Sequence, residues 1–450
     1  MKKLLMTITV LSMTSLCATG VTFNCRTRKV QKGWPEKFIR ENIVRAADNV
    51  HCYEVLDSTV TPAPCGYKPF YVSHIGRHGS RTPTSSTSLK YVDVLHECDS
   101  LGNLTAVGRD LMETLDKTRG LIVDTGLDGI LTDRGAAEHR AIASRVCRHY
   151  PEIFTDPSRR NVSCFSTMVP RVIRSMDNFT SVVAESYPDL AIRKRFSNES
   201  DFTRFQTGNV HLSDSIRSRI VRSPAINKAI DKRLNSFDWT RLCTLVFKDG
   251  MAPEKYRGRE GSFFRHLFSI GVYRQCFIDD DPQWFKPYFT EDEMFEFWRS
   301  TGSQNWQRWG WTAENQGYPP KSTYRILQSI VRDADAVIAG ADTCATFRFS
   351  HDGNVLPLIC LMGLYRNTFT GSWTEIDKYA CMGYTMHMAG NIQLIFFRNK
   401  KGNVLVKILL NDEETFIPGF RPKEKGLFYE WKSLRTYLLQ RADIGKSLLD

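Results

Sequence analysis

The sequence has few of the features that define a membrane protein or a small domain held by metal or disulfides. Beyond the first 20 residues, no stretch approaches the roughly 18 consecutive apolar residues of a transmembrane helix. No Cys-x-x-Cys pair occurs, so neither a zinc ribbon nor a thioredoxin-type redox site is indicated. Internal repeats and low-complexity segments are also absent. Any specific function must therefore be read from local motifs in an ordinary globular chain.

Size and charge give the first positive indications. The chain has 450 residues, of which 42% are hydrophobic, enough to bury one large core or two smaller ones. Lys and Arg number 61 against 49 Asp and Glu, a net charge of +12. An excess of this size favours anionic partners: phosphorylated small molecules, nucleic acid or a membrane surface. Nucleic acid is not predicted, because the sequence contains no helix-turn-helix, zinc-finger or aromatic RNA-binding signature.

The N-terminus has the layout of a signal peptide. Lys2 and Lys3 precede an apolar run from Leu4 to Leu16, and small residues follow up to Gly20. This run is too short to span a bilayer, so residues 1–20 are predicted to be a cleaved signal peptide. The mature protein is expected to be exported, either to a periplasm or to the outside of the cell.

Cysteine usage fits an exported protein without defining a disulfide framework. The chain has 12 cysteines, and an oxidising compartment would permit disulfides among them. Cys25, Cys52 and Cys65 lie close enough in sequence to be candidates. Cys147 and Cys360 occur in apolar, helix-like stretches and are predicted to be buried thiols.

The order of predicted elements indicates an α/β fold. Strands are predicted over 67–75 and 162–168, and again over 346–350, 392–398 and 404–410. Helices are predicted over 35–49, within 88–117, from about 135 to 149, over 171–185 and over 427–441. Strands alternating with helices predict a central, mostly parallel sheet flanked by helices.

The middle of the chain has a different residue pattern from its two ends. From about 190 to 335 strand signals become sparse, and aromatic residues and arginines interleave between turns. We therefore predict an α/β domain built from residues 21–189 and 336–450, with a mostly helical cap inserted at 190–335. Residues 191–274 carry 17 Lys and Arg against 8 Asp and Glu, whereas residues 275–335 carry 6 against 10. The basic half is either a solvated face or a surface that attracts a polyanionic substrate.

The most informative local motif is Arg-His-Gly-Ser-Arg-Thr-Pro, residues 77–83, directly after the first strand. Arg77 and Arg81 flank a histidine, and each planar guanidinium can bind phosphate oxygens through two hydrogen bonds. Gly79 has no Cβ, so the backbone can turn sharply and let an oxyanion approach. A neutral His78 could attack phosphorus and carry the phosphoryl group covalently. His74 and His78 are four residues apart but lie across a strand end, so they are not expected to bind a metal.

Two further segments place ionisable residues after predicted strands. Asp352 follows His351 directly before an apolar, helix-like run, where α/β folds place their sites. Asp352 could protonate a leaving alcohol and later take a proton from water, while His351 could add a donor to a phosphate. Arg171 begins a helix after the strand at 162–168, so its side chain and the helix N-terminus can both face an anion.

These motifs, taken in order, resemble the histidine acid phosphatase family, the second branch of the histidine phosphatase superfamily. The resemblance rests on the run at 77–83, on Leu-Thr-x-x-Gly at 131–135, on Arg171, and on His351 with Asp352. That branch contains phytases and multiple inositol polyphosphate phosphatases. The resemblance implies an α/β domain with a helical cap inserted between the first and last motifs.

The resemblance also implies roles for individual residues. His78 would be the phosphorylated nucleophile and Asp352 the proton donor. Arg77, Arg81 and Arg171 would bind phosphate together with His351. No metal or organic cofactor is expected, because the arginines supply the positive charge that a magnesium ion supplies elsewhere.

The C-terminal third is similar to the inositol polyphosphate phosphatase members of the family. The similarity lies in residues 349–358, 388–394 and 406–411. One departure is that those members usually carry His-Ala-Glu where this chain has His351-Asp352-Gly353.

Because of the similarity to these members, hydrolysis of phytate or other inositol polyphosphates is the expected activity. A broad acid phosphatase or sugar-phosphatase, and an exported anion-binding protein without turnover, are the alternatives.

Overall fold

The computed structural model describes residues 30–57, 59–196, 216, 218, 223–277, 283–422 and 426–446. The predicted signal peptide at 1–20 lies outside the described residues. Among the described residues, no helix is both long enough and apolar enough to cross a membrane.

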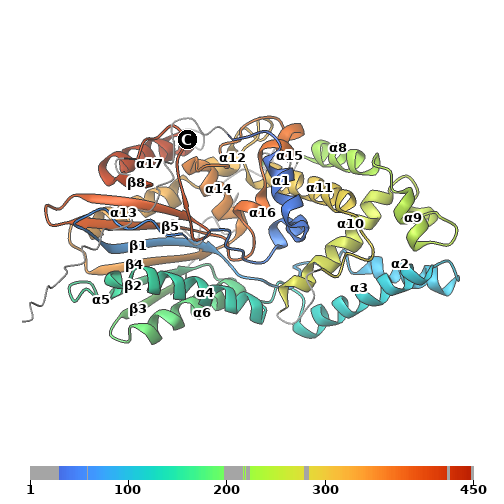
Figure 1. The fold of residues 1–450 in the computed structure, drawn as a ribbon, viewed down its shortest axis with the longest axis horizontal. Coiled ribbons are helices and arrows are strands. Elements are labelled where there is room, and N and C mark those ends of the chain that lie inside the picture. Colours follow the sequence, from blue (N-terminus) through green and yellow to red (C-terminus); the bar gives the residue numbers. More distant parts are fainter. Residues whose placement is uncertain are drawn as a thin grey trace, which may run out of the picture.

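An eight-stranded mixed sheet forms the centre of the molecule (Figure 1). Its order is β3-β2-β4-β1-β5-β6-β7, and β8 pairs with β6. The first four strands in this order are parallel, whereas β5, β6, β7 and β8 are antiparallel to their neighbours. The strands are β1 (Tyr67–Arg77), β2 (Asn161–Ser166), β3 (Ala191–Phe196), β4 (Thr343–Ser350), β5 (Asn391–Asn399), β6 (Val404–Leu410), β7 (Glu413–Thr415) and β8 (Phe428–Glu430).

Helices cover both faces of this sheet, each over its own hydrophobic core (Figure 1). One face carries α4 (Asp133–His149), α5 (Pro151–Thr155) and α6 (Pro170–Ser186). The other face carries α13 (Tyr324–Ile338), α14 (Asp352–Met362) and α17 (Trp431–Lys446). Because both faces are covered, the central strands β1 and β4 are buried along nearly their whole length. The predicted α/β class is confirmed.

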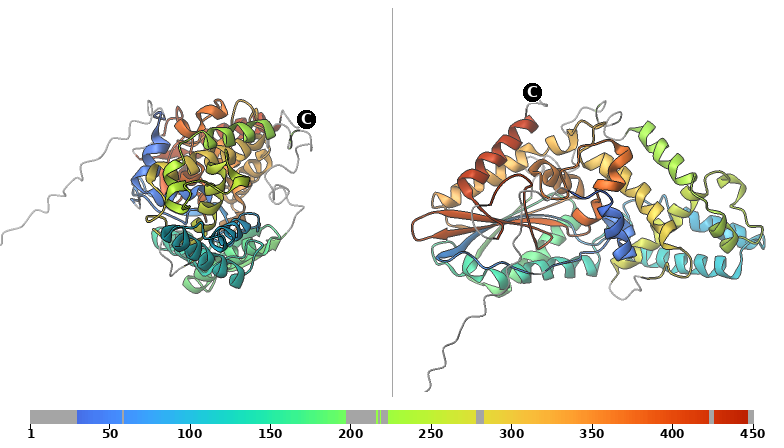
Figure 2. Two further views of the ribbon diagram at one scale, coloured as in Figure 1. Left: turned by 90° about the vertical axis from the view of Figure 1, so that its right-hand side faces the viewer. Right: turned by 45° about the horizontal axis from the view of Figure 1, so that its top comes forward.

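A helical layer extends from one end of the sheet and has a third hydrophobic core (Figures 1 and 2). Residues 34–122 and residues 234–298 both contribute to that core, together with Cys381. The layer is therefore assembled from two separate parts of the chain. Its main helices are α1 (Trp34–Glu41), η1 (Ile43–Val50), α2 (Lys90–Ser100), α3 (Ala106–Thr125), α8 (Pro224–Asn235), α9 (Thr240–Val246), α10 (Glu260–Gly271), η5 (Val272–Cys276) and α11 (Glu291–Trp309).

Short elements complete the chain. They are η4 (Glu254–Tyr256), α12 (Tyr318–Lys321), η6 (Trp373–Glu375), α15 (Ile376–Tyr379) and α16 (Met382–Thr385). Several long helices begin at capping residues that their sequences already contain. The Thr132 hydroxyl accepts a hydrogen bond from the Gly135 amide at the start of α4, and Thr290 and Glu293 form a capping box at the start of α11.

Two elements differ from the sequence prediction. The helix predicted over 35–49 is interrupted at Asn42, whose extended backbone separates α1 from η1. Strand β3 lies within the region predicted to be helical, because its run of Arg193, Lys194 and Arg195 hides the strand pattern. These charges are exposed on the edge of the sheet, where they discourage pairing with another chain. The division of the chain at 190 and 335 stays a prediction.

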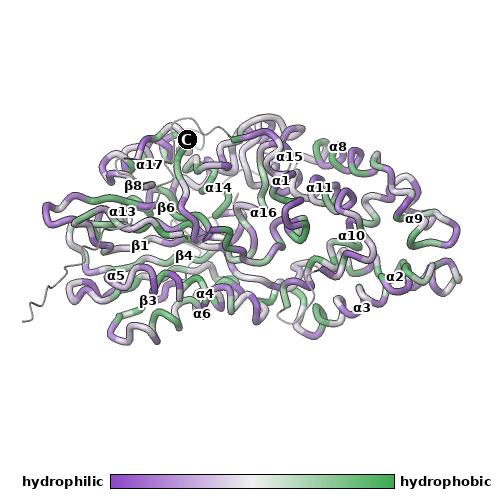
Figure 3. Tube along the Cα trace, viewed as in Figure 1, coloured by the Kyte–Doolittle hydropathy of each residue, from purple (hydrophilic) through white to green (hydrophobic). Residues whose placement is uncertain are grey.

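Hydrophobic and hydrophilic segments alternate along the helices that surround the sheet (Figure 3). This alternation agrees with one-sided burial in helices such as α13, whereas α14 is buried on every side. All ten cysteines in the described part of the chain are free, and Cys147 and Cys360 are buried as predicted. Cys52 and Cys65 therefore form no disulfide here, and Cys25 lies outside the described residues.

Candidate functional site

The three predicted motifs meet at one edge of the sheet, beside the helical layer. Strand β1 ends at Arg77, which lies opposite Ser350, the last residue of β4. The end of β2, at Ser166, lies opposite Phe349 of the same strand. The carboxyl ends of neighbouring parallel strands are where α/β folds bind their ligands. His78, Thr167 and His351 each follow one of these ends.

The imidazole of His78 is buried and held in one orientation. Its exposed fraction is 2%, and Nδ1 lies 3.0 Å from the Gly79 carbonyl oxygen. A carbonyl can only accept, so Nδ1 carries the proton and Nε2 keeps its lone pair. Burial, followed by the positive charges of Arg77 and Arg171, lowers the pKa of His78 well below its usual value. His78 is therefore neutral at neutral and mildly acidic pH, and the lone pair of its Nε2 is available.

The loop that carries His78 is fixed by a buried carboxylate. Glu138 on α4 accepts hydrogen bonds from the Ser80 amide and the Ser80 hydroxyl, both at 2.7 Å, and from the Tyr53 amide at 3.0 Å. Gly79 packs directly on Gly135 of α4, where a Cβ on Gly79 would lie 2.4 Å from the Gly135 carbonyl oxygen. The two glycines let the loop lie against the first turn of α4.

Arg77 is completely buried and joins three parts of the chain. Its Nη1 donates to the Asn49 carbonyl at 2.5 Å and to the Met386 carbonyl at 3.0 Å. Its Nη2 lies 3.1 Å from Oδ2 of Asp352. Burial lowers the pKa of Arg77, while the neighbouring Asp352 raises it. Its contacts therefore hold the guanidinium in a single position.

Arg81 and Arg171 lie side by side over Gly129. A Cβ on Gly129 would lie 3.2 Å from Nη1 of Arg171 and 3.3 Å from Cδ of Arg81, and Gly129 has a φ of +72°. Burial and the charge of Arg81 lower the pKa of Arg171 to about 10, so it remains positively charged. The Nε atoms of Arg77, Arg81 and Arg171 are buried and have no hydrogen-bond partner in the described part of the chain. Convergent buried donors of this kind are suited to the oxygens of an anion.

The ring of His351 lies edge-on to the ring of His78. The two rings are 5.7 Å apart between centroids, and Nε2 of His351 lies 3.2 Å from the Thr167 hydroxyl. Burial, together with Arg171, lowers the pKa of His351 to about 3. A neutral His351 can donate one hydrogen bond to an oxyanion without adding a charge.

Asp352 is the first residue of α14 and is the only acid whose carboxylate contacts Arg77 among the described ion pairs. Its Oδ1 accepts from the Gly353 amide at 2.8 Å, and its Oδ2 accepts from the Asn49 side chain at 3.2 Å. Burial favours the neutral acid, but Arg77 and Arg81 outweigh it and lower the pKa of Asp352 to about 2. Asp352 is therefore ionised when the site holds no substrate.

The sequence-predicted site residues thus come together in one place, and three further residues join them. Thr167 contacts His351, Glu138 holds the loop at Ser80, and Asn49 contacts Asp352. Thr167 directly follows a strand, so its position in the sequence could have identified it as a candidate site residue. Asn49 and Glu138 carry no local signal, because their partners are remote in sequence.

Among the described residues, no group of three or more His, Cys, Asp or Glu side chains could hold a metal ion. Independence from cofactors stays a prediction.

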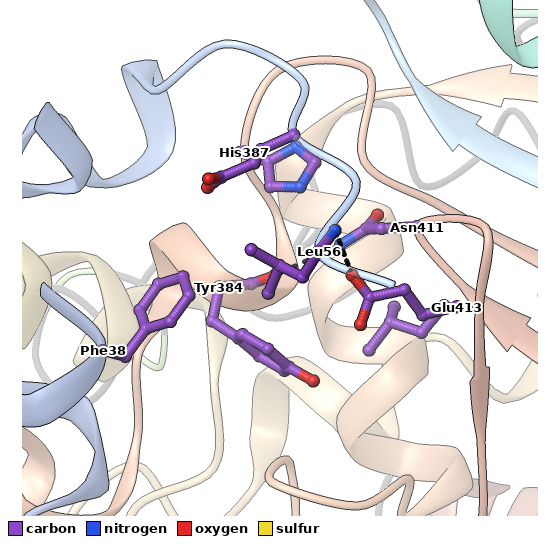
Figure 4. Close-up of a pocket in the computed structure, with 8 residues that line it drawn as sticks. Phe38, Leu56, Tyr384, His387, Asn411 and Glu413 are labelled. Carbon is purple, nitrogen blue, oxygen red and sulfur yellow. Dashed lines mark hydrogen bonds between the residues drawn. The ribbon is translucent and has the colours of Figure 1, made fainter. Parts of the chain in front are cut away.

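Two cavities lie near the site. The smaller one, of about 10 Å³, lies among Tyr384, His387 and Glu413, where the Leu56 amide donates to Glu413 (Figure 4). It has room for about one water molecule and is too small for a phosphate ester. The larger one, of about 300 Å³, adjoins the loop at Pro83 and Thr84. Its other lining residues include Ser85, Ser88, Arg265, His266, Tyr273 and Thr301.

The sequence was compared with models of known protein families, and one of them matches. The model of the histidine phosphatase superfamily, branch 2, matches residues 71–232. The predicted resemblance is therefore confirmed over the segment that carries the first motif and Arg171. No curated protein matches the sequence.

Solved structures share the fold at low identity. The multiple inositol polyphosphate phosphatase of Bifidobacterium longum superposes with a TM-score of 0.71 at 17% identity, covering 88% of this chain and 97% of that one. The phytase of D. castellii gives a TM-score of 0.64 at 14% identity, covering 89% and 86%. The B. longum protein has also been solved with inositol hexasulfate and with phosphate.

Proposed function

We propose, starting from the resemblance to branch 2 of the histidine phosphatase superfamily, that this chain hydrolyses phosphate monoesters through a phosphohistidine. The observation that carries the proposal is the convergence of a neutral, oriented His78 with three arginines and His351 at one sheet edge. The arginines bind the phosphoryl oxygens and stabilise the negative charge that develops on them in the transition state.

The first step forms one bond and breaks another. Nε2 of His78 attacks phosphorus while the bond from phosphorus to the ester oxygen breaks, and Asp352 gives its proton to the leaving alcohol. The Gly79 carbonyl accepts from Nδ1–H and stabilises the positive charge that develops on the imidazole. The products are a free alcohol, a phosphorylated His78 and an ionised Asp352.

The second step restores the site. Water attacks phosphorus, its proton passes to the Asp352 carboxylate, and the phosphorus–nitrogen bond breaks. Inorganic phosphate leaves, and His78 returns to its neutral form.

Asp352 needs its proton only when substrate is present. Its pKa of about 2 is set by neighbouring arginines, whose charge a bound phosphate neutralises. Loss of that stabilisation moves the pKa of Asp352 upward, toward the range in which it can act as an acid. Substrate binding thus prepares the proton donor.

The substrate class that we favour is inositol polyphosphates such as phytate. The cavity of about 300 Å³ beside the loop offers room for the ring and its other phosphates. The basic stretch at 191–274 would also attract a polyanion. The B. longum relative, solved with inositol hexasulfate, supports the same class. A broad-specificity acid phosphatase is the second candidate, because the phosphate-binding group alone would accept any monoester.

Phosphate release by the purified mature chain from phytate and from p-nitrophenyl phosphate tests this proposal. We expect faster release from phytate. Equal or faster release from the simple ester would favour the broad phosphatase. No release from either would overturn the proposal and leave an anion-binding protein, which binding of inorganic phosphate would then detect.

Asp352→Asn is expected to fail chiefly on esters with poor leaving groups. The amide keeps the shape but has no proton to give, so kcat on β-glycerophosphate should fall by about 10²- to 10⁴-fold. The loss on p-nitrophenyl phosphate should be much smaller, because nitrophenolate leaves without protonation. Asp342→Asn, at the opposite end of β4, is the matched control. Full activity of Asp352→Asn on phytate would show that another group is the acid.

A further inference from the structure

The carboxylate of Asp352 is contacted from three parts of the chain. The Gly353 amide donates to Oδ1 and the Asn49 side chain donates to Oδ2, while Nη2 of Arg77 forms an ion pair with Oδ2. With both oxygens contacted, the carboxyl group has one favourable orientation. The contacts with Arg77 and with the Gly353 amide are explained by the phosphate site and by the start of α14. The third, Asn49, lies in η1 and is 303 residues away in sequence.

Asn49 is itself held from both sides. Its carbonyl accepts from Nη1 of Arg77 at 2.5 Å. Its side-chain oxygen Oδ1 lies 3.4 Å from Nδ2 of Asn305, which is on α11 of the helical layer. Because Asn305 donates to this oxygen, the amide nitrogen of Asn49 is the atom that faces Asp352.

The backbone before Asn49 is in an uncommon conformation. Asp48 has a φ of +53° and a ψ of −121°, a region that favours glycine. Its buried carboxylate accepts from the Gly383 amide at 3.0 Å and from Asn305 at 2.8 Å. Strained residues of this kind persist only where the surroundings hold them, and they cluster at functional sites. Here the strained residue turns the next one, Asn49, toward the proton donor.

We propose that Asn49 is a positioning residue for Asp352, and that Asn305 and Asp48 hold it in place. This inference rests on the proposed role of Asp352 as the proton donor. The amide of Asn49 fixes the direction of the carboxyl group and stabilises the carboxylate that remains after the proton has passed to the leaving alcohol. Through Asn305, the helical layer contributes to the chemistry without touching the substrate.

Titration of the Asp352 carboxyl group tests whether Asn49 acts on it, and the test does not depend on enzyme turnover. Asn49→Ala removes the donor, and Asn49→Asp puts a second carboxylate in its place. The matched control is Asn161→Ala, because the Asn161 amide also donates to a carboxylate, that of Asp342, far from the site. The Asp352 carboxyl carbon is followed by NMR in protein labelled with ¹³C-aspartate, and Asp352→Asn assigns its signal.

We expect the wild-type carboxyl to stay ionised at pH 4. Its pKa should rise by about one unit in Asn49→Ala and further in Asn49→Asp, where two like charges face each other. Asn161→Ala should leave it unchanged. An Asp352 titration that is the same in both Asn49 variants and in the wild type would overturn the proposal.

Kinetics supply the second readout. Asn49→Ala should lower kcat on β-glycerophosphate about tenfold and change kcat on p-nitrophenyl phosphate less than twofold. The alkaline limb of its pH profile should move to higher pH, because an acid with a raised pKa keeps its proton longer. Equal losses on both esters would indicate a merely structural role and overturn the proposal. An inactive wild type would overturn the proposed function, while the titration would still decide whether Asn49 acts on Asp352.

Discussion

His78→Ala is expected to abolish phosphate release, lowering kcat by at least about 10⁴-fold. The methyl group of alanine has no lone pair with which to attack phosphorus. His351 is the nearest alternative, but its Nε2 is engaged by Thr167 and its ring centroid is 5.7 Å from that of His78. The fold should survive, because within the described part of the chain the one hydrogen bond of the His78 ring is to the carbonyl of the next residue, Gly79.

The measurement pairs steady-state turnover with a quench of the covalent intermediate. Wild type treated with ³²P-labelled substrate should carry label on histidine, and His78→Ala should carry none. His96→Ala is the matched control, since His96 pairs with Asp116 on the surface of the helical layer. Substantial turnover by a folded His78→Ala protein would remove the phosphohistidine from the mechanism.

Gly135→Ala is expected to damage both stability and activity, although Gly135 would touch no substrate. A Cβ at this position would lie 2.2 Å from the Ser80 carbonyl oxygen and 2.7 Å from the Ser80 amide nitrogen, closer than real contacts allow. Ser80 cannot yield easily, because Glu138 holds its amide and the Thr132 amide donates to its carbonyl at 3.0 Å. The loop must therefore move and take His78 and Arg81 with it.

Overpacking of this kind typically costs about 1–3 kcal/mol of unfolding free energy. A displacement of about 1 Å at the site lowers kcat/KM by about 10²-fold. Urea unfolding and turnover measure the two effects. Gly120→Ala is the control, because Gly120 lies in the interior of α3 with open space around it. That substitution should stabilise the protein by about 0.5–1 kcal/mol and leave turnover unchanged. If Gly135→Ala matched the wild type in both assays, the close packing would not be what positions the loop.

Local signals were enough to predict five of the eight strands, β1, β2, β4, β5 and β6, and to place the candidate site residues after strand ends. The apolar run before Arg77 has the length and composition of a buried strand, and β1 is confirmed. The same holds for β4, β5 and β6, whose alternating or continuous apolar residues need no distant information. His78, Arg171 and His351 each follow a strand, and parallel strand ends meet at one edge, so their proximity followed from the chain order.

Other features escaped prediction because a neighbour in space determines them. The basic run of β3 reads as a solvated segment, and only pairing with β2 makes it a strand. The break at Asn42 separates α1 from η1, and both contribute residues to the core of the helical layer. Helices α2 and α3, from the first part of the chain, also belong to the helical layer. No change in amino-acid composition along the sequence indicates this.

The motifs and their order along the chain were enough to predict the fold class, the candidate phosphate-binding arginines and the candidate nucleophile, because those depend on residue type and local spacing. Tertiary packing decided how strongly burial lowers the pKa of His78 and which residues contact Asp352, the candidate proton donor. Asn49 and Asp352 are 303 residues apart, and Glu138 reaches Ser80 across 58. Hydrogen bonds over such separations exist only after the chain has folded, because in the unfolded chain the entropy of closing so long a loop opposes them.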